Sequence, residues 1–155
     1  MILIHDEHIK FMQTALSEAK KAERKAEVPI GAVLVAENEE ILSAAHNQTV
    51  TLNDPSAHAE ILAIRKGAEK IQNYRLLNTT LYVTLEPCPM CMGAVIHARI
   101  ARVVFGARDP KWGAAGSLYN FATDHRFNHQ LQIIEGICVS ECKEVMKEFF
   151  RQKRG

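Results

Sequence analysis

The chain has 155 residues, which is enough for one ordinary domain and too few for two. It is 47% apolar and 24% charged with a net charge of +1, which argues against a disordered chain, a generally basic nucleic-acid coat and an acidic tail. The longest apolar stretch, residues 30–36, is far shorter than the about 20 residues that cross a bilayer, and the start is unlike a secretory leader. We therefore expect a single cytoplasmic domain over residues 1–155.

The first half of the chain predicts a helix, a hairpin and a second helix. Apolar residues recur at helical spacing after Asp6, a suitable N-cap residue for the first helix. Two apolar runs, residues 30–35 and 41–45, flank a polar tetrapeptide, which is typical of a β-hairpin. The Asp-Pro-Ser sequence at 54–56 is a helix start signal and predicts a helix that reaches about Ile71.

The second half predicts an alternation of strands and helices. Apolar and polar side chains alternate over 80–86, which indicates a strand, and a helix is expected over about 89–101. Strands over 102–107 and 131–137 follow, and Ser140 would cap a closing helix. Such alternation favours an α/β fold with helices on both faces of a sheet. The sheet should be mixed, because a hairpin is antiparallel.

Residues of metal-ligating types begin two of these helices. His58-Ala59-Glu60 lies at the start of one helix, and Pro87-Cys88-Pro89-Met90-Cys91 at the start of the other. Two sulfurs and one nitrogen suit zinc, and three protein ligands leave the fourth tetrahedral position for water. We therefore predict that His58, Cys88 and Cys91 bind one Zn²⁺ per chain.

Glu60 is the candidate for acid–base catalysis. Bound zinc lowers the pKa of its water to about 7, but protons must still move between water, substrate and leaving group. A residue two places past a ligand on a helix points away from the side of that ligand. Glu60 is therefore expected to reach the bound water rather than the metal.

The H-x-E and P-C-x-x-C pair is the signature of zinc-dependent nucleobase deaminases. With five further segments it closely resembles the bacterial tRNA-specific adenosine deaminases of the cytidine/deoxycytidylate deaminase superfamily, essentially over the whole chain. These segments are residues 73–76, 80–88, 103–107, 113–117 and 127–129.

The resemblance implies a homodimer with a three-layer α/β/α cytidine-deaminase-like fold around a mixed five-stranded sheet. It also implies hydrolytic deamination of the wobble adenosine in a tRNA anticodon loop to inosine. Zinc-bound hydroxide would attack C6 of the adenine, with Glu60 as the proton shuttle. The implied partner is an arginine tRNA with an adenosine wobble base.

The resemblance also implies which residues contact the substrate. Asn47 matches the family's base-contacting asparagine, whose amide can both donate to and accept from a purine, and the backbone around Ala57 and Cys88 would complete the pocket. In the family, one loop borders the RNA and the last helix contacts it. The matching residues here are Arg108, Asp109 and Lys111 in the loop and Phe150 and Arg151 in the helix.

The types of residue in the sequence also indicate further basic side chains that would contact the RNA. A site that accepts an unstacked base needs cations and aromatic side chains around it. Arg99, Arg102, Arg108 and Lys111 form a basic group that Asp109 alone opposes locally in the sequence, and they are expected to flank the site. Trp112 departs from the smaller residue that the resemblance leads us to expect at its position.

Other interpretations of these residues stay open. Cys88 and Cys91 are also typical of a redox pair or, with Cys138 and Cys142, of a structural zinc site with four thiolates. Otherwise Cys138 and Cys142 are small core residues. The alternative enzyme is a zinc-dependent deaminase of a free nucleobase or nucleoside of the cytidine, guanine or adenine type. A third class is an RNA-binding or structural zinc module without catalysis.

Overall fold

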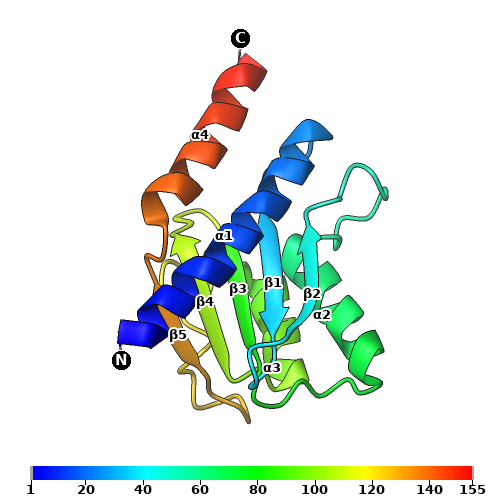
Figure 1. Ribbon diagram of the computed structural model, residues 1–155, viewed down its shortest axis with the longest axis vertical. Helices are drawn as coiled ribbons and strands as arrows, with labels where there is room; N and C mark the ends of the chain where they lie inside the picture. Colours follow the sequence, from blue (N-terminus) through cyan, green and yellow to red (C-terminus); the bar gives the residue numbers. More distant parts are fainter. Residues whose placement is uncertain (1, 155) are drawn as a thin grey trace.

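The computed structural model describes residues 2–154 of the chain. The chain opens with a helix and a β-hairpin, and helices and strands then alternate except between the last two strands, as Figure 1 shows. In chain order the elements are α1 (Ile2–Arg24), β1 (Gly31–Val35), β2 (Ile41–His46), α2 (Ala59–Ile71), β3 (Thr80–Leu85), α3 (Pro89–Ala98), β4 (Arg102–Ala107), β5 (Gln132–Glu135) and α4 (Val139–Arg154).

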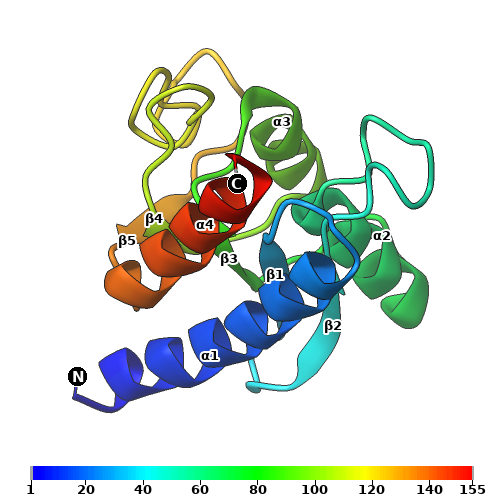
Figure 2. The same ribbon diagram turned by 90° about the horizontal axis from the view of Figure 1, so that it is seen from above.

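The strands form one mixed sheet in the order β2-β1-β3-β4-β5. β1 pairs antiparallel with β2 and with β3, while β3 and β4, and β4 and β5, pair in parallel. Helices α1 and α4 cover one face of the sheet, and α2 and α3 cover the other (Figures 1 and 2). The predicted three-layer α/β/α fold with a mixed five-stranded sheet is therefore confirmed.

Alternating side chains of the central strands supply two hydrophobic cores. Leu34 and Phe105 are fully buried on the side of α2 and α3, and Val33 and Val104 are fully buried on the side of α1 and α4. Because successive strand residues point to opposite faces, both cores fix the register of the strands. The loops at the strand ends therefore emerge at fixed places. None of the described helices is both long and apolar enough to cross a membrane.

The predicted caps of the first and last helices are wrong. α1 already begins at Ile2, so Asp6 lies inside the helix rather than at its boundary. α4 begins at Val139, which places Ser140 within its first turn. A capping residue marks a helix start only where the preceding backbone leaves the helical conformation, and its side-chain type alone does not fix that.

Two other elements end earlier than predicted. α3 stops at Ala98 because Arg99 adopts the left-handed conformation, with φ 62°. β5 covers only Gln132–Glu135, within the predicted range 131–137, because Gly136 has φ 84° and turns the chain out of the extended conformation. In both cases a single residue with positive φ sets the boundary.

The start of α2 differs from the prediction in a way that matters for the site. The Asp54 carboxylate accepts hydrogen bonds from the N–H and the hydroxyl of Ser56, at 2.9 and 2.7 Å, and so forms a local turn instead of a helix cap. α2 begins only at Ala59, and His58 is its N-cap residue, with extended backbone and no side-chain cap bond. The His58 ring is thus not used to cap the helix.

A buried carboxylate shapes the loop between β2 and α2. Glu27 accepts hydrogen bonds from the N–H of Val50 at 3.2 Å and from the N–H and hydroxyl of Thr51, both at 2.6 Å. Burial alone would raise the pKa of Glu27, but the hydrogen bonds from Thr51 and Val50 outweigh burial and hold the pKa below its usual value. Glu27 therefore stabilises the folded chain as a carboxylate.

We expect Glu27→Gln to lower the free energy of unfolding at pH 7 by about 1 to 3 kcal/mol, because an amide nitrogen would replace one acceptor of a buried carboxylate. The contribution of a carboxylate with a depressed pKa is fully present above the unfolded pKa of about 4.3 and is lost as the pH falls through the folded value. The difference between wild type and variant should therefore shrink below about pH 4. Urea unfolding from pH 7 to 3 measures it, with exposed Glu37→Gln as control; a difference that grows in acid would contradict this role.

Candidate metal centre and its cavity

The starts of α2 and α3 bring three ligand-type side chains together. The Nδ1 atom of His58 lies 3.6 Å from Sγ of Cys88 and 3.5 Å from Sγ of Cys91. All three candidate ligand atoms lie within 4.8 Å of one another. Zn–S bonds of about 2.3 Å and Zn–N bonds of about 2.1 Å at a tetrahedral angle separate sulfur and nitrogen by about 3.6 Å. The three side chains therefore fit zinc.

The local backbone explains this convergence. His58 and Cys88 are the N-cap residues of α2 and α3, both with extended backbone and neither with a side-chain cap bond, and Cys91 lies one turn into α3. In the described chain no fourth His, Cys, Asp or Glu joins the group. A bound ion would thus keep a coordination position that no protein donor of these types fills, as catalytic zinc sites do.

The pKa values of the two thiols, Cys88 and Cys91, shift in opposite directions. A hydrogen bond from Cys91, with a further one from His58, lowers the pKa of Cys88 to about 4, although burial opposes this. The same contact with Cys88 and burial raise the pKa of Cys91. The hydrogen bond to Cys88 raises the pKa of His58. These shifts favour a thiolate at Cys88 and a protonated thiol at Cys91, whose proton a coordinated cation would displace.

Glu60 lies beside these ligands in the first turn of α2 but outside the ligand group. Its side chain is 4% exposed and faces the same cavity as His58 and Cys88. Burial raises the pKa of Glu60 to about 7, while its own backbone N–H and the charge of His58 act in the opposite direction. A carboxyl group that is buried in this way can hold or release a proton near neutral pH.

The cavity in front of the ligands has a volume of about 830 Å³. Its walls come from the starts of α2 and α3, the loop after β4 and one face of α4. Basic and aromatic side chains share this wall with Glu60. They are Arg108, Lys111, Trp112, Lys143, Lys147 and Phe150.

Four of the residues expected at the RNA surface line this cavity: Arg108, Asp109, Lys111 and Phe150. Phe150 is 42% exposed, so its ring is accessible to a ligand. The Asp109 carboxylate instead accepts the N–H groups of Lys111 and Trp112, at 3.0 and 3.3 Å, and thereby shapes the turn of the loop.

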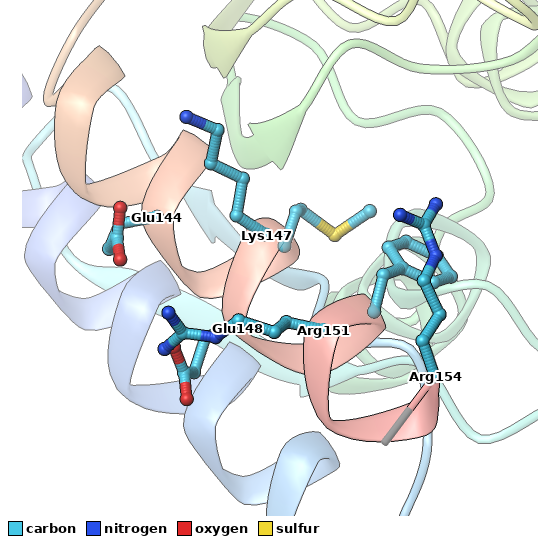
Figure 3. A pocket seen from close by; sticks show the side chains of 7 residues that line it. Glu144, Lys147, Glu148, Arg151 and Arg154 are labelled. Carbon is cyan, nitrogen blue, oxygen red and sulfur yellow. The ribbon is translucent and has the colours of Figure 1, made fainter.

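Arg151 lies outside the cavity. It lines a neighbouring hollow of about 630 Å³ on α4, where its guanidinium pairs with Glu148. Figure 3 shows Arg151 turned toward Glu148, with Arg154 on the other side of the hollow. Phe150 lines this hollow as well as the cavity, so it lies between the cavity and Arg151 on the surface of α4.

Asn47 and Ala57 lie behind the cavity wall rather than on it. The Nδ2 atom of Asn47 donates to the carbonyl of Val28, which lines the cavity, at 3.4 Å. Its Oδ1 is buried and has no hydrogen-bond partner among the described residues. The N–H of Ala57 donates to the carbonyl of Asp54 at 3.1 Å. An unpaired buried amide oxygen is costly, and it is an acceptor available for a ligand if the wall opens.

The expectation that Arg99 and Arg102 flank the site is wrong. Arg99 follows α3 and donates to the carbonyl of Ile96 at 2.8 Å. Arg102 begins β4, whereas Arg108 follows its other end, so about 20 Å of extended strand separates them. An acid that is distant in the sequence also pairs with the basic group, because both oxygens of Glu135 accept hydrogen bonds from Arg108, at 2.8 and 2.6 Å.

Sequence reasoning missed two parts of the wall. Lys143 and Lys147 line the cavity with Phe150, and their spacing of four and three residues was a detectable helical signal. Glu86, 2% exposed, also lines the cavity, although the sequence pattern assigned it only to the end of a strand. No local pattern marks Glu86, because its partners lie 23 to 31 residues further along the chain.

The alternative with four thiolates is wrong. Cys142 is buried on the opposite side of the sheet, with Cys138 packed beside it in the core under α1 and α4. Neither belongs to the candidate metal group, and the cysteines are all free. These two residues are therefore core side chains.

Comparison with known proteins shows which enzyme family the chain belongs to. The profile of the cytidine and deoxycytidylate deaminase zinc-binding region matches residues 5–107, and the chain belongs to this family of deaminases. The tRNA-specific adenosine deaminase of Haemophilus influenzae is 51% identical over 145 residues, which cover 94% of this chain and 84% of that protein.

Two further relatives agree. The tRNA-specific adenosine deaminase of Bacillus subtilis is 51% identical over 144 residues, which cover 93% of this chain and 89% of that protein. A solved structure from a study of tRNA:A34 deaminases, which edit A to I at the wobble position, is 44% identical. It superposes with a TM-score of 0.85 over 88% of this chain and 98% of that chain. The family resemblance seen in the sequence is thus confirmed.

Proposed function

We propose that this protein is a zinc-dependent hydrolase that converts the wobble adenosine of a tRNA anticodon loop to inosine. The observation that carries the proposal is the convergence of His58, Cys88 and Cys91 at the wall of a cavity that Glu60 also lines. The choice of substrate is supported by 51% identity to two tRNA-specific adenosine deaminases over more than nine-tenths of the chain. We take residues 1–155 as one deaminase domain that acts as a homodimer on cytoplasmic tRNA, with an arginine tRNA as the first candidate.

The four residues divide the chemistry between them. His58 Nδ1 and the sulfurs of Cys88 and Cys91 would hold one zinc ion per chain, which lowers the pKa of a coordinated water to about 7. The Glu60 carboxylate accepts a proton from the water that adds to C6 of the adenine and delivers it to N1. Glu60 then takes the second proton of that water to the amino group, which leaves as ammonia. The net reaction is adenosine plus water to inosine plus ammonia.

The surrounding residues would bind the RNA. We assign the Asn47 amide, whose Oδ1 is the unpaired acceptor behind the wall, and the backbone near Ala57 and Cys88 to the adenine. The cationic side chains that line the cavity would contact the phosphates, and the ring of Phe150 would stack on a base next to the adenine. The cations are Arg108 and Lys111, with Arg151 at the margin; Asp109 supports them by shaping the loop.

Replacing Phe150 with alanine should raise KM for an anticodon stem-loop about tenfold, because stacking of one base on an aromatic ring contributes about 1 to 3 kcal/mol. The kcat value should change little, because Phe150 is not in the ligand group. Steady-state kinetics measure both values. Tyr74→Ala removes an aromatic ring that is 67% exposed elsewhere and is the matched control. Equal effects of the two variants would contradict a stacking role for Phe150.

The proposal is tested by incubating the zinc-loaded protein with an arginine tRNA that carries an adenosine wobble base. Inosine should appear at that position, and a tRNA with cytidine at the same position should stay unchanged. Free adenosine, cytidine and guanine are assayed in parallel, since turnover of one of them without tRNA turnover would favour a deaminase of free bases or nucleosides. Zinc and RNA binding without conversion of any of these substrates would favour a non-catalytic module.

A further inference from the structure

Glu86 is a buried carboxylate between β3 and the ligand Cys88, and the proton transfers assigned to Glu60 do not require it. Four donors surround it. Oε1 accepts the N–H of Asp109 at 3.1 Å and the hydroxyl of Ser117 at 2.5 Å, and Oε2 accepts the N–H groups of Ala115 and Ser117, both at 3.0 Å. None of the ion pairs among the described residues involves Glu86, so these donors are what compensates its burial.

All four donors belong to one loop, residues 109–117, which follows β4. The same loop supplies cavity-lining residues from Asp109 to Trp112, directly after Arg108. A second bond joins it to the segment of the ligands, because the N–H of Ala114 donates to the carbonyl of Pro87 at 2.8 Å. The loop is thus fastened to the residues that immediately precede Cys88.

Gly113 shows how closely the loop packs on this carboxylate. A Cβ atom at Gly113 would lie 2.4 Å from Oε2 of Glu86 and 2.5 Å from the carbonyl oxygen of Asp109. Side chains do not approach to such distances, so only glycine allows the loop to close over Glu86. The carboxylate and the glycine form one packing unit between the metal ligands and the cavity wall.

We propose that Glu86 is a positioning residue that holds the 109–117 loop as the RNA-facing wall of the cavity. The proposal rests on the proposed function, since the wall contacts RNA only if the protein acts on RNA. Glu86 does not touch the reacting atoms. It fixes the loop so that Lys111 and the adjoining Arg108 are presented at a set distance from the metal ligands.

Glu86→Gln tests this, because it keeps the side-chain size and replaces one oxygen with an NH₂ group that faces N–H and hydroxyl donors. We expect KM for the anticodon stem-loop to rise about tenfold, with kcat within about threefold of wild type and zinc retained. The slope of log KM against log salt should fall by about 0.7 for each phosphate of a single strand that the displaced loop no longer neutralises. General destabilisation would lower the active fraction without changing that slope.

Three further variants define the contact. Gly113→Ala disturbs the same packing with the carboxylate intact and should reproduce the KM and salt effects. Ser117→Ala removes only the hydroxyl bond and should give a smaller effect in the same direction. The exposed Glu37→Gln, at the β1–β2 hairpin, changes the charge equally and should behave as wild type.

Hydrogen exchange supplies a measurement that does not depend on activity. In Glu86→Gln the amides of Asp109, Ala115 and Ser117 should exchange at least about tenfold faster than in wild type, with β3 unchanged. Unchanged exchange, or a loss of kcat with wild-type KM and salt slope, overturns the positioning role. If wild type itself forms no inosine, the proposed function fails, and the exchange rates alone then decide whether Glu86 holds the loop.

Discussion

Glu60→Gln should lower kcat for the tRNA stem-loop by at least about 10³-fold while the protein keeps its zinc. Glutamine fills the same buried space in α2 but cannot carry a proton between water, N1 and the leaving amino group. A single positioned acid or base contributes about 10² to 10⁴ in rate, and here one side chain performs successive transfers. Single-turnover inosine formation measures the effect.

The matched control is Glu69→Gln, an exposed acid on the same helix, which should retain wild-type kcat and zinc. Zinc content and RNA affinity of Glu60→Gln should also equal those of wild type. If the variant loses its zinc, Glu60 is a ligand and the division between ligands and proton carrier is wrong. If it keeps full turnover, another group moves the protons.

Cys88→Ala should reduce bound zinc from one ion per chain to almost none and abolish turnover. Removing one of three protein ligands leaves two donors, which is too few for a catalytic zinc site. Because binding to the folded state alone stabilises by mass action, wild type should gain about 4 kcal/mol when free zinc exceeds the dissociation constant 1,000-fold. The variant should lose this zinc-dependent gain. Metal analysis and thermal unfolding with and without chelator measure these effects.

The double variant Cys138→Ala/Cys142→Ala is the control for thiol chemistry in general. These cysteines pack in the core on the other face of the sheet, so zinc content should equal that of wild type even if the melting temperature falls. If the double variant loses zinc and Cys88→Ala retains it, the metal does not bind at the starts of α2 and α3.

Much of the fold follows from local patterns. The alternation in β3 and the hairpin of β1 and β2 are periodic signals, and the strand prediction 102–107 has the same bounds as β4. The candidate ligands also follow from local geometry, because a Cys-x-x-Cys pair at a helix start spans one turn. The meeting of His58 with this pair is a long-range contact, which the ligand chemistry of the two helix starts indicated and the family resemblance supported.

The errors in the prediction come from competition between interactions and from distance in the chain. Asp54 carries a good capping side chain but bonds to Ser56 instead, and the helix starts later. Arg102 and Arg108 are six positions apart in sequence and lie at opposite ends of one strand. The groups that donate hydrogen bonds to Glu86 lie more than twenty positions away in the sequence. Periodicity reports none of these contacts.

The bidentate pair between Arg108 and Glu135 bears on how selective the protein can be among cellular RNAs. A phosphate that binds Arg108 would have to compete with this carboxylate, so the contact would contribute less free energy than one with an unpaired arginine. On the proposed function, this competition would weaken non-specific binding of RNA at Arg108, and selectivity would depend more on a purine held inside the cavity.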